Sequence, residues 1–225
     1  MTGVREPAAR RRNQPLLPAP AARVLHVTAA VAAVVVVLLG VLNAGHTEPG
    51  WFDAWVQPAA TRSVGAAWSA AIAVDFLGEP RGSVTVVVVL AVLFAVLRRW
   101  RVLALALAGP GLTIAVTALG KPLADRTIHT VYLSYPSGHT AFVTAVTLAV
   151  AMPLAGRLRA GPVVVLACAL VTGAYAGWAQ VGLSAHYATD AIGGFCTAVA
   201  VVPATATLID RIWRRTATGP RPGQA

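Results

Sequence analysis

Six long apolar runs constrain the fold of this chain more than any other feature of its sequence. They cover residues 24–44, 83–98, 102–120, 138–155, 161–179 and 187–209. A helix needs roughly 20 apolar residues to cross about 30 Å of hydrocarbon, and each run could form such a span, the second being the shortest. Charged residues make up only 12% of the chain, against about 25% in an average soluble domain. The sequence therefore predicts an all-α integral membrane bundle of six transmembrane helices.

The basic residues fall mostly on one side of this predicted bundle. With a cytoplasmic amino terminus, most of the 18 lysines and arginines are cytoplasmic, whereas Arg62, Arg81, Lys121 and Arg126 lie on the other side. Such asymmetry is the positive-inside rule, and it explains the net charge of +10 without a nucleic-acid partner. We expect a multi-pass protein of the cell membrane with both termini in the cytoplasm.

The ends of the chain lack the apolar periodicity of a packed core. Residues 1–22 are rich in Arg, Pro and Ala, which predicts a disordered amino-terminal tail. The six-helix domain is expected over 23–210, followed by a short cytoplasmic tail over 211–225. The stretch 45–81 holds several tryptophans among acidic and small residues, which is typical of a segment at the membrane surface.

A seventh span over 62–78 is the alternative for part of that stretch. It would bury Asp75 or place it near a helix end, and it would invert the orientation of everything downstream. The charge asymmetry favours six spans, and whether 62–78 is interfacial or embedded stays open.

Under the six-span topology, three polar segments meet at the outer face: 121–129, 135–139 and 186–190. The second reads Pro-Ser-Gly-His and leads directly into an apolar helix. The first N–H groups of a helix have no intrahelical acceptor and favour anions, phosphate in particular. We therefore expect Ser137 and Gly138 to help bind phosphate, with the glycine allowing close backbone approach.

The third segment pairs a histidine with a carboxylate. His186 and Asp190 are four residues apart at a helix start, so both side chains lie on one face. A carboxylate that holds Nδ1–H leaves Nε2 free as a nucleophile, and His139 could protonate the departing oxygen. Lys121 and Arg126 would supply positive charge for the phosphoryl oxygens.

These residues resemble the type 2 phosphatidic acid phosphatase superfamily. Its pattern combines Lys-x6-Arg-Pro, Pro-Ser-Gly-His and Ser-Arg-x5-His-x3-Asp elements, and the resemblance covers roughly 83–209. It implies a six-helix membrane enzyme that dephosphorylates lipids without a metal, through a phosphohistidine. By this similarity His186 is the nucleophile, Asp190 its orienting partner and His139 the general acid, while Lys121 matches the lysine of the first element.

Two positions depart from the family pattern. Seven residues after Lys121, where the pattern has Arg, this chain has Ile128, and Arg126 lies two positions earlier. Six residues before His186, the expected Arg is Gln180. Loss of a charge-assisted contact costs about 1.5–3 kcal/mol. We expect a divergent but competent pocket, and whether Arg126, His129 or Gln180 replaces a missing arginine stays open.

The sequence thus predicts a membrane lipid phosphatase, with a lipid phosphate as substrate and no cofactor. Phosphatidic acid, phosphatidylglycerol phosphate and prenyl mono- or pyrophosphates all remain open, as does the oligomeric state. Phosphoryl transfer to another acceptor, or a non-catalytic lipid-phosphate binder or transporter, are the alternatives. Zinc binding by His129, His139 and His186 is disfavoured, because metal-ligand spacing is lacking and nearby cations would repel the ion. A phosphate contact by His129 stays open.

Overall fold

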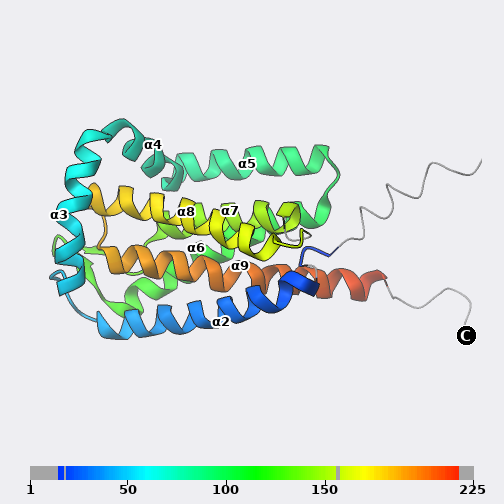
Figure 1. Ribbon diagram of the computed structural model, residues 1–225, viewed down its shortest axis with the longest axis horizontal. Helices are drawn as coiled ribbons and strands as arrows, with labels where there is room; N and C mark the ends of the chain where they lie inside the picture. The colour runs from blue at the N-terminus through cyan, green and yellow to red at the C-terminus, as the bar shows by residue number, and fades with distance from the viewer. Residues whose placement is uncertain (1–14, 18, 156–157, 218–225) are drawn as a thin grey trace, which may run out of the picture.

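The computed structural model describes residues 15–17, 19–155 and 158–217. This part of the chain forms a bundle of long helices lying side by side, with one helix across its end (Figure 1). The elements in chain order are α2 (Ala19–Leu42), α3 (Trp51–Ala66), α4 (Trp68–Gly78), α5 (Pro80–Val96), α6 (Trp100–Ala124), β1 (Thr127–Ile128), β2 (Tyr132–Leu133), α7 (Gly138–Ala155), α8 (Gly161–Gly182) and α9 (Ala188–Ala217).

The predicted all-α membrane bundle is confirmed. Five helices, namely α2, α6, α7, α8 and α9, are long and apolar enough to cross a membrane, and α4 with α5 forms a sixth candidate span bent by 70°. Helix α7 lies against α6, α8 and α9, and its buried face is rich in alanine and threonine. Small side chains let membrane helices approach closely. These helices make the chain a multi-pass membrane protein.

The stretch expected at the membrane surface divides into two helices. Helix α3 runs across one end of the bundle, opposite the end where α2 begins and α9 finishes (Figure 1). The helix breaks at Ala67, whose φ of −127° and ψ of 37° are not helical. The possible seventh span over 62–78 is therefore not one helix, because it covers the end of α3 and the short α4. Helix α4 belongs with α5 to one candidate span that bends after Gly78.

Part of the predicted disordered tail is ordered, which corrects the boundary placed at residue 22. The carboxylate of Asp210 accepts hydrogen bonds from the N–H groups of Leu16 and Leu17, at 3.1 and 3.2 Å. Both leucines are buried against the bundle. Helix α2 begins at Ala19 and α9 continues to Ala217, so the helical domain extends beyond 23–210 at both ends. Residues 1–14 and 218–225 of the predicted tails lie outside the described residues.

A groove of about 850 Å³ lies between α3, α8 and α9. Its walls are mostly apolar: Phe52 and Trp55 contribute from α3, Trp178 and Val181 from α8, and Phe195 from α9. The groove borders the two helix ends that flank the α8–α9 loop, since Val181 and Ala188 both line it. This loop carries His186.

Candidate functional site

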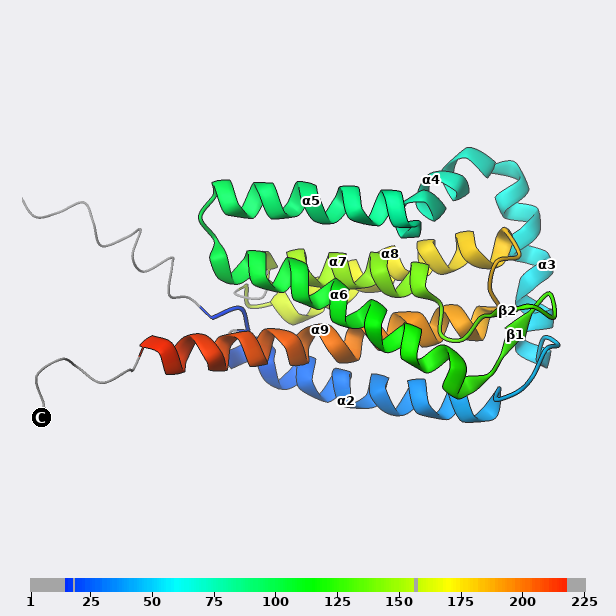
Figure 2. The same ribbon diagram turned by 180° about the vertical axis from the view of Figure 1, so that it is seen from behind.

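The three predicted polar segments do meet at the end of the bundle that α3 covers. The β1–β2 hairpin, the start of α7 and the α8–α9 loop all lie there (Figure 2). The antiparallel hairpin pairs Thr127 with Leu133 and Ile128 with Tyr132. Lys121, in the last turn of α6, donates a hydrogen bond from Nζ to the carbonyl oxygen of Leu133 at 2.7 Å. The lysine thus ties the hairpin to α6 and stays partly exposed.

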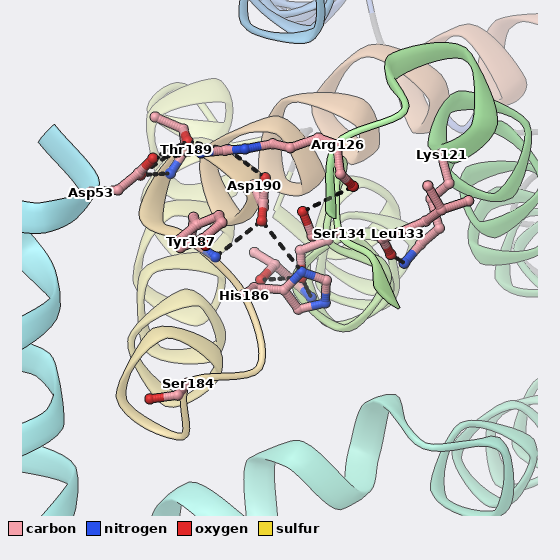
Figure 3. Close-up of polar contacts among 12 residues, drawn as sticks. Asp53, Lys121, Arg126, Leu133, Ser134, Ser184, His186, Tyr187, Thr189 and Asp190 are labelled. Carbon is pink, nitrogen blue, oxygen red and sulfur yellow. Dashed lines mark hydrogen bonds and ion pairs between the residues drawn. The ribbon is translucent and has the colours of Figure 1, made fainter. Parts of the chain in front are cut away.

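His186 and Asp190 lie together as their spacing predicts (Figure 3). His186 Nδ1 is 3.7 Å from Asp190 Oδ2, beyond hydrogen-bond distance but within ion-pair range. The same Oδ2 accepts the N–H of Tyr187 at 3.0 Å and so caps the start of α9. Since Nδ1 faces the carboxylate, Nε2 is the nitrogen left for chemistry.

Arg126 is placed differently from its expected role. Its guanidinium is fully buried: Nη1 donates to Asp190 Oδ1 at 2.6 Å, and Nη2 donates to Asp53 Oδ2 at 2.7 Å. Nη1 also reaches Thr189 Oγ1 at 2.6 Å, and the group lies 4.5 Å from the centre of the Tyr187 ring. Both terminal nitrogens are engaged, so in this geometry Arg126 positions Asp190 and does not offer a fork to phosphate.

Asp53 is a member of the site that the sequence analysis missed. It lies in the first turn of α3, is 1% exposed, and accepts hydrogen bonds from Thr189 N and Oγ1 at 2.9 and 3.0 Å. Through Arg126 and Thr189 it fixes α3 to the start of α9 (Figure 3). In the sequence Asp53 is a single carboxylate within an aromatic stretch, and nothing near it indicates that Arg126, 73 residues away, is its partner.

The start of α7 is built as expected, with its two polar residues in different roles. Ser137 is fully buried, and its Oγ accepts the Thr140 N–H at 3.4 Å, so the hydroxyl caps the helix. Its own N–H donates to the Asp190 carbonyl oxygen at 3.0 Å. At Gly138 an added Cβ would meet nothing within 4 Å, so the backbone here borders open space. Of the two, Gly138 is the one available to a ligand.

Two glycines of α9 allow this close arrangement. A Cβ at Gly194 would come 2.2 Å from the Ser137 carbonyl oxygen, and a Cβ at Gly193 would come 2.4 Å from Tyr135 Cε2. Real Cβ atoms do not approach so closely, so only glycine lets the turn before α7 lie on α9. The same turn is held by the Tyr135 hydroxyl, which donates to the Val36 carbonyl oxygen at 2.6 Å.

His139, in the first turn of α7, faces His186 across the site. The two ring centres are 6.4 Å apart, with the planes inclined by 57°. His139 Nε2 lies 3.5 Å from Asp75 Oδ1 and 3.6 Å from Glu79 Oε1. A Cβ at Gly78 would be 2.2 Å from His139 Cδ2, so the imidazole rests directly on the backbone between α4 and α5. These two carboxylates were not among the predicted site residues.

The two other residues considered for phosphate binding, Gln180 and His129, are both in contact with other groups. Gln180, at the position of a missing arginine, is 1% exposed and donates from Nε2 to Asp75 Oδ1 at 2.8 Å. His129 is exposed in the hairpin turn, with Nε2 2.9 Å from the carbonyl oxygen of Ser184. Neither side chain brings a permanent positive charge to the histidine pair.

Comparison of the chain with family models, curated proteins and solved structures gives no match. The site is therefore interpreted from its own geometry and from the sequence motifs. Within the described residues, an imidazole on α7 and one in the α8–α9 loop each lie beside carboxylates, and the start of α7 borders open space at Gly138. Such a constellation can attack and protonate one bound group.

Proposed function

We propose that this protein is a membrane phosphatase that hydrolyses a phosphomonoester or pyrophosphate lipid through a phosphohistidine. The observation that carries the proposal is the facing pair of His186 and His139, 6.4 Å apart between ring centres. A nucleophile acts from about 3–3.5 Å and an acid from about 2.6–3.2 Å. Two imidazoles at this separation can therefore contact one bound phosphoryl group, His186 at phosphorus and His139 at the leaving oxygen.

The reaction proceeds in two balanced steps. His186 Nε2 attacks phosphorus, the bond from phosphorus to the lipid oxygen breaks, and His139 gives its proton to that oxygen. A water molecule then loses a proton to His139 and attacks the phosphohistidine. The phosphorus–nitrogen bond breaks, and its electron pair returns to His186. Asp190 stabilises the positive charge on the His186 ring, and Arg126 with Asp53 holds Asp190 in place.

Phosphate is held by backbone and by one lysine in this proposal. The first N–H groups of α7, beside Gly138, lie at the positive end of the helix dipole and can donate hydrogen bonds to an anion. Lys121 Nζ is a second cation at this end of the bundle, and it donates to the carbonyl oxygen of Leu133 and not to a carboxylate. The apolar groove between α3, α8 and α9 suits the lipid tail, since its lining is apolar and it borders the loop that carries His186.

The proposed enzyme lies in the cell membrane with both termini cytoplasmic and the site on the outer side. The arginine-rich ends of α6 and α9, with Arg99, Arg101 and Arg211, support this orientation by the positive-inside rule. The site lies at the opposite end of the bundle, next to α3 (Figure 1).

The test is phosphate release by the detergent-solubilised protein from a panel of lipid phosphates and pyrophosphates in excess EDTA. We expect release by the wild type and a loss of at least about 10³-fold in His186→Ala, with labelled phosphate trapped on the wild type after acid-free quenching. His26→Ala is the matched control, since His26 lies in α2 and contacts Thr207 instead of the site.

Each outcome separates the proposal from its alternatives. Release that persists undiminished in His186→Ala contradicts the mechanism. Phosphorylation of an added alcohol in place of water indicates a transferase. Saturable binding of a lipid phosphate without release across the panel indicates a non-catalytic binder.

A further inference from the structure

The bend between α4 and α5 brings two carboxylates onto one imidazole nitrogen. Asp75 lies in the last turn of α4, and Glu79 precedes Pro80, where α5 begins. Their oxygens lie 3.5 and 3.6 Å from His139 Nε2, and all three atoms lie within 4.8 Å of one another. The 70° bend is what turns both side chains toward α7.

Within the described residues, His139 is the one basic side chain in ion-pair range of these two carboxylates, and it is charged only when protonated. Arg126 is engaged by Asp53 and Asp190, and Lys121 donates to a backbone carbonyl. Within the described residues, no lysine or arginine forms an ion pair with Asp75 or Glu79. A carboxylate that loses contact with water is normally paired with a cation or with a metal ion, and Asp75 is the more buried of the two.

Two buried polar atoms at the cluster also have no hydrogen-bond partner. His139 Nε2 is one of them. The other is Oε1 of Gln180, whose side chain is 1% exposed and whose Nε2 donates to Asp75. The amide of Gln180 is thus held against the cluster with its acceptor oxygen unused. Buried polar atoms are nearly always satisfied, so an orphaned imidazole nitrogen and amide oxygen at one place point to a missing ligand.

We infer that Asp75, Glu79 and His139 bind a divalent transition-metal ion, zinc by preference. One imidazole and two carboxylates are a ligand set that suits zinc, with a fourth position left open. Bonds of about 2.0–2.2 Å place tetrahedral ligand atoms about 3.3–3.6 Å apart, close to the 3.5 and 3.6 Å separations from His139 Nε2. The separation of the two carboxylate oxygens, within 4.8 Å, must shorten to the same range, and Glu79 is the exposed side chain of the three.

The ion has a direct consequence for the proposed phosphatase, on which this step of the inference depends. It takes the lone pair of His139 Nε2, so this nitrogen can no longer carry a proton for the leaving oxygen. Zinc therefore inhibits turnover, and a chelator restores it. The site makes zinc a reversible regulator of the enzyme, while the hydrolysis itself proceeds without metal.

Binding is tested without reference to activity, by titrating the full-length protein in detergent with Co²⁺ and then displacing it with Zn²⁺. We expect one saturable Co²⁺ per chain, with the intense visible absorption of a four-coordinate site. Glu79→Gln should weaken binding at least 10-fold, whereas Glu48→Gln, an exposed glutamate outside the cluster, should bind as the wild type does. A zinc-induced rise in unfolding temperature in the wild type, absent in Glu79→Gln, reports binding independently.

Regulation is tested by phosphate release over a zinc titration, with an EDTA arm. We expect zinc to inhibit the wild type over the range in which it displaces Co²⁺, and to leave Glu79→Gln unaffected over that range. Absence of saturable Co²⁺ binding, equal binding by Glu79→Gln, or stimulation by zinc overturns the inference. If the protein releases phosphate in EDTA but binds no metal, the ion site is contradicted and the proposed phosphatase stands. If it binds metal but releases no phosphate in EDTA, the proposed phosphatase is contradicted and the ion site stands.

Discussion

Replacing Arg126 by methionine tests whether this arginine positions Asp190 or binds phosphate. Methionine fills most of the space of the arginine stem but carries no charge. The change leaves the carboxylates of Asp53 and Asp190, 1% and 0% exposed, without the cation that lies 2.7 and 2.6 Å from them. Two buried negative charges then face the same apolar gap.

The magnitude follows from the burial of all three groups. Removing one partner of a buried ion pair costs about 3–5 kcal/mol, because the remaining charge stays desolvated and unpaired. For a chain of this size, about 2–4 °C is lost per kcal/mol, so the unfolding temperature should fall by about 6–20 °C. Asp190 also loses its anchor beside His186, and a displacement of about 1 Å costs about 10²-fold in turnover.

The assay pairs thermal unfolding in detergent, at one fixed scan rate, with phosphate release in EDTA. Arg81→Met is the matched control, because Arg81 is exposed at the start of α5 and should lower neither quantity. In the double variant Arg126→Met with Asp53→Asn, one of the two stranded carboxylates is neutralised. We expect it to recover part of the lost stability, with a coupling of about 1–3 kcal/mol.

The opposite pattern refutes the positioning role. If Arg126→Met unfolds at the wild-type temperature but binds substrate poorly, with a raised KM, then the guanidinium serves phosphate as the sequence motifs predict. An additive double variant likewise shows that Arg126 and Asp53 do not interact in the folded protein.

Two further substitutions probe the histidine pair. Gly78→Ala places a methyl group 2.2 Å from His139 Cδ2 and must rotate the imidazole, so phosphate release should fall at least about 10-fold. Gly65→Ala, where a Cβ meets nothing within 4 Å, should keep full activity, and equal activity of the two variants contradicts this role of Gly78. Gln180→Arg restores a cation where the family pattern has one, beside Asp75, and should alter KM or headgroup preference. Unchanged kinetics show that phosphate is held without this position.

The spans and the meeting of His139 with His186 could be predicted because both depend on local patterns. An apolar run of sufficient length forms a helix in lipid whatever its neighbours, since its backbone must be satisfied internally. An alternation of spans then fixes which loops share a face. The four-residue spacing of His186 and Asp190 predicted the contact between these two side chains. It did not indicate that Asp190 also caps the start of α9.

The charged partners of these residues could not be predicted from local patterns. Arg126 pairs with Asp53 and Asp190, 73 and 64 residues away, and spacing along the chain carries no information about such contacts. One feature of the sequence does indicate the bend that brings Asp75 and Glu79 close to His139. Proline is favoured in the first turn of a helix, and Pro80 begins α5. The end of α4 before it, at Gly78, lies against the His139 ring, a contact that local sequence does not indicate.

Two clusters of charged side chains lie at this end of the bundle, and they differ in whether their carboxylates are paired with an arginine. Asp53, Arg126 and Asp190 are almost inaccessible to solvent, and both carboxylates pair with the one guanidinium, so moving any one of the three leaves a buried charge unpaired. Such a group can hold a geometry but cannot exchange partners with a substrate. Asp75, Glu79 and His139 are partly open, and within the described residues they hold no lysine or arginine. A site that binds and releases protons or a metal cation requires this second kind of charge, and the α4–α5 bend is the element that supplies it.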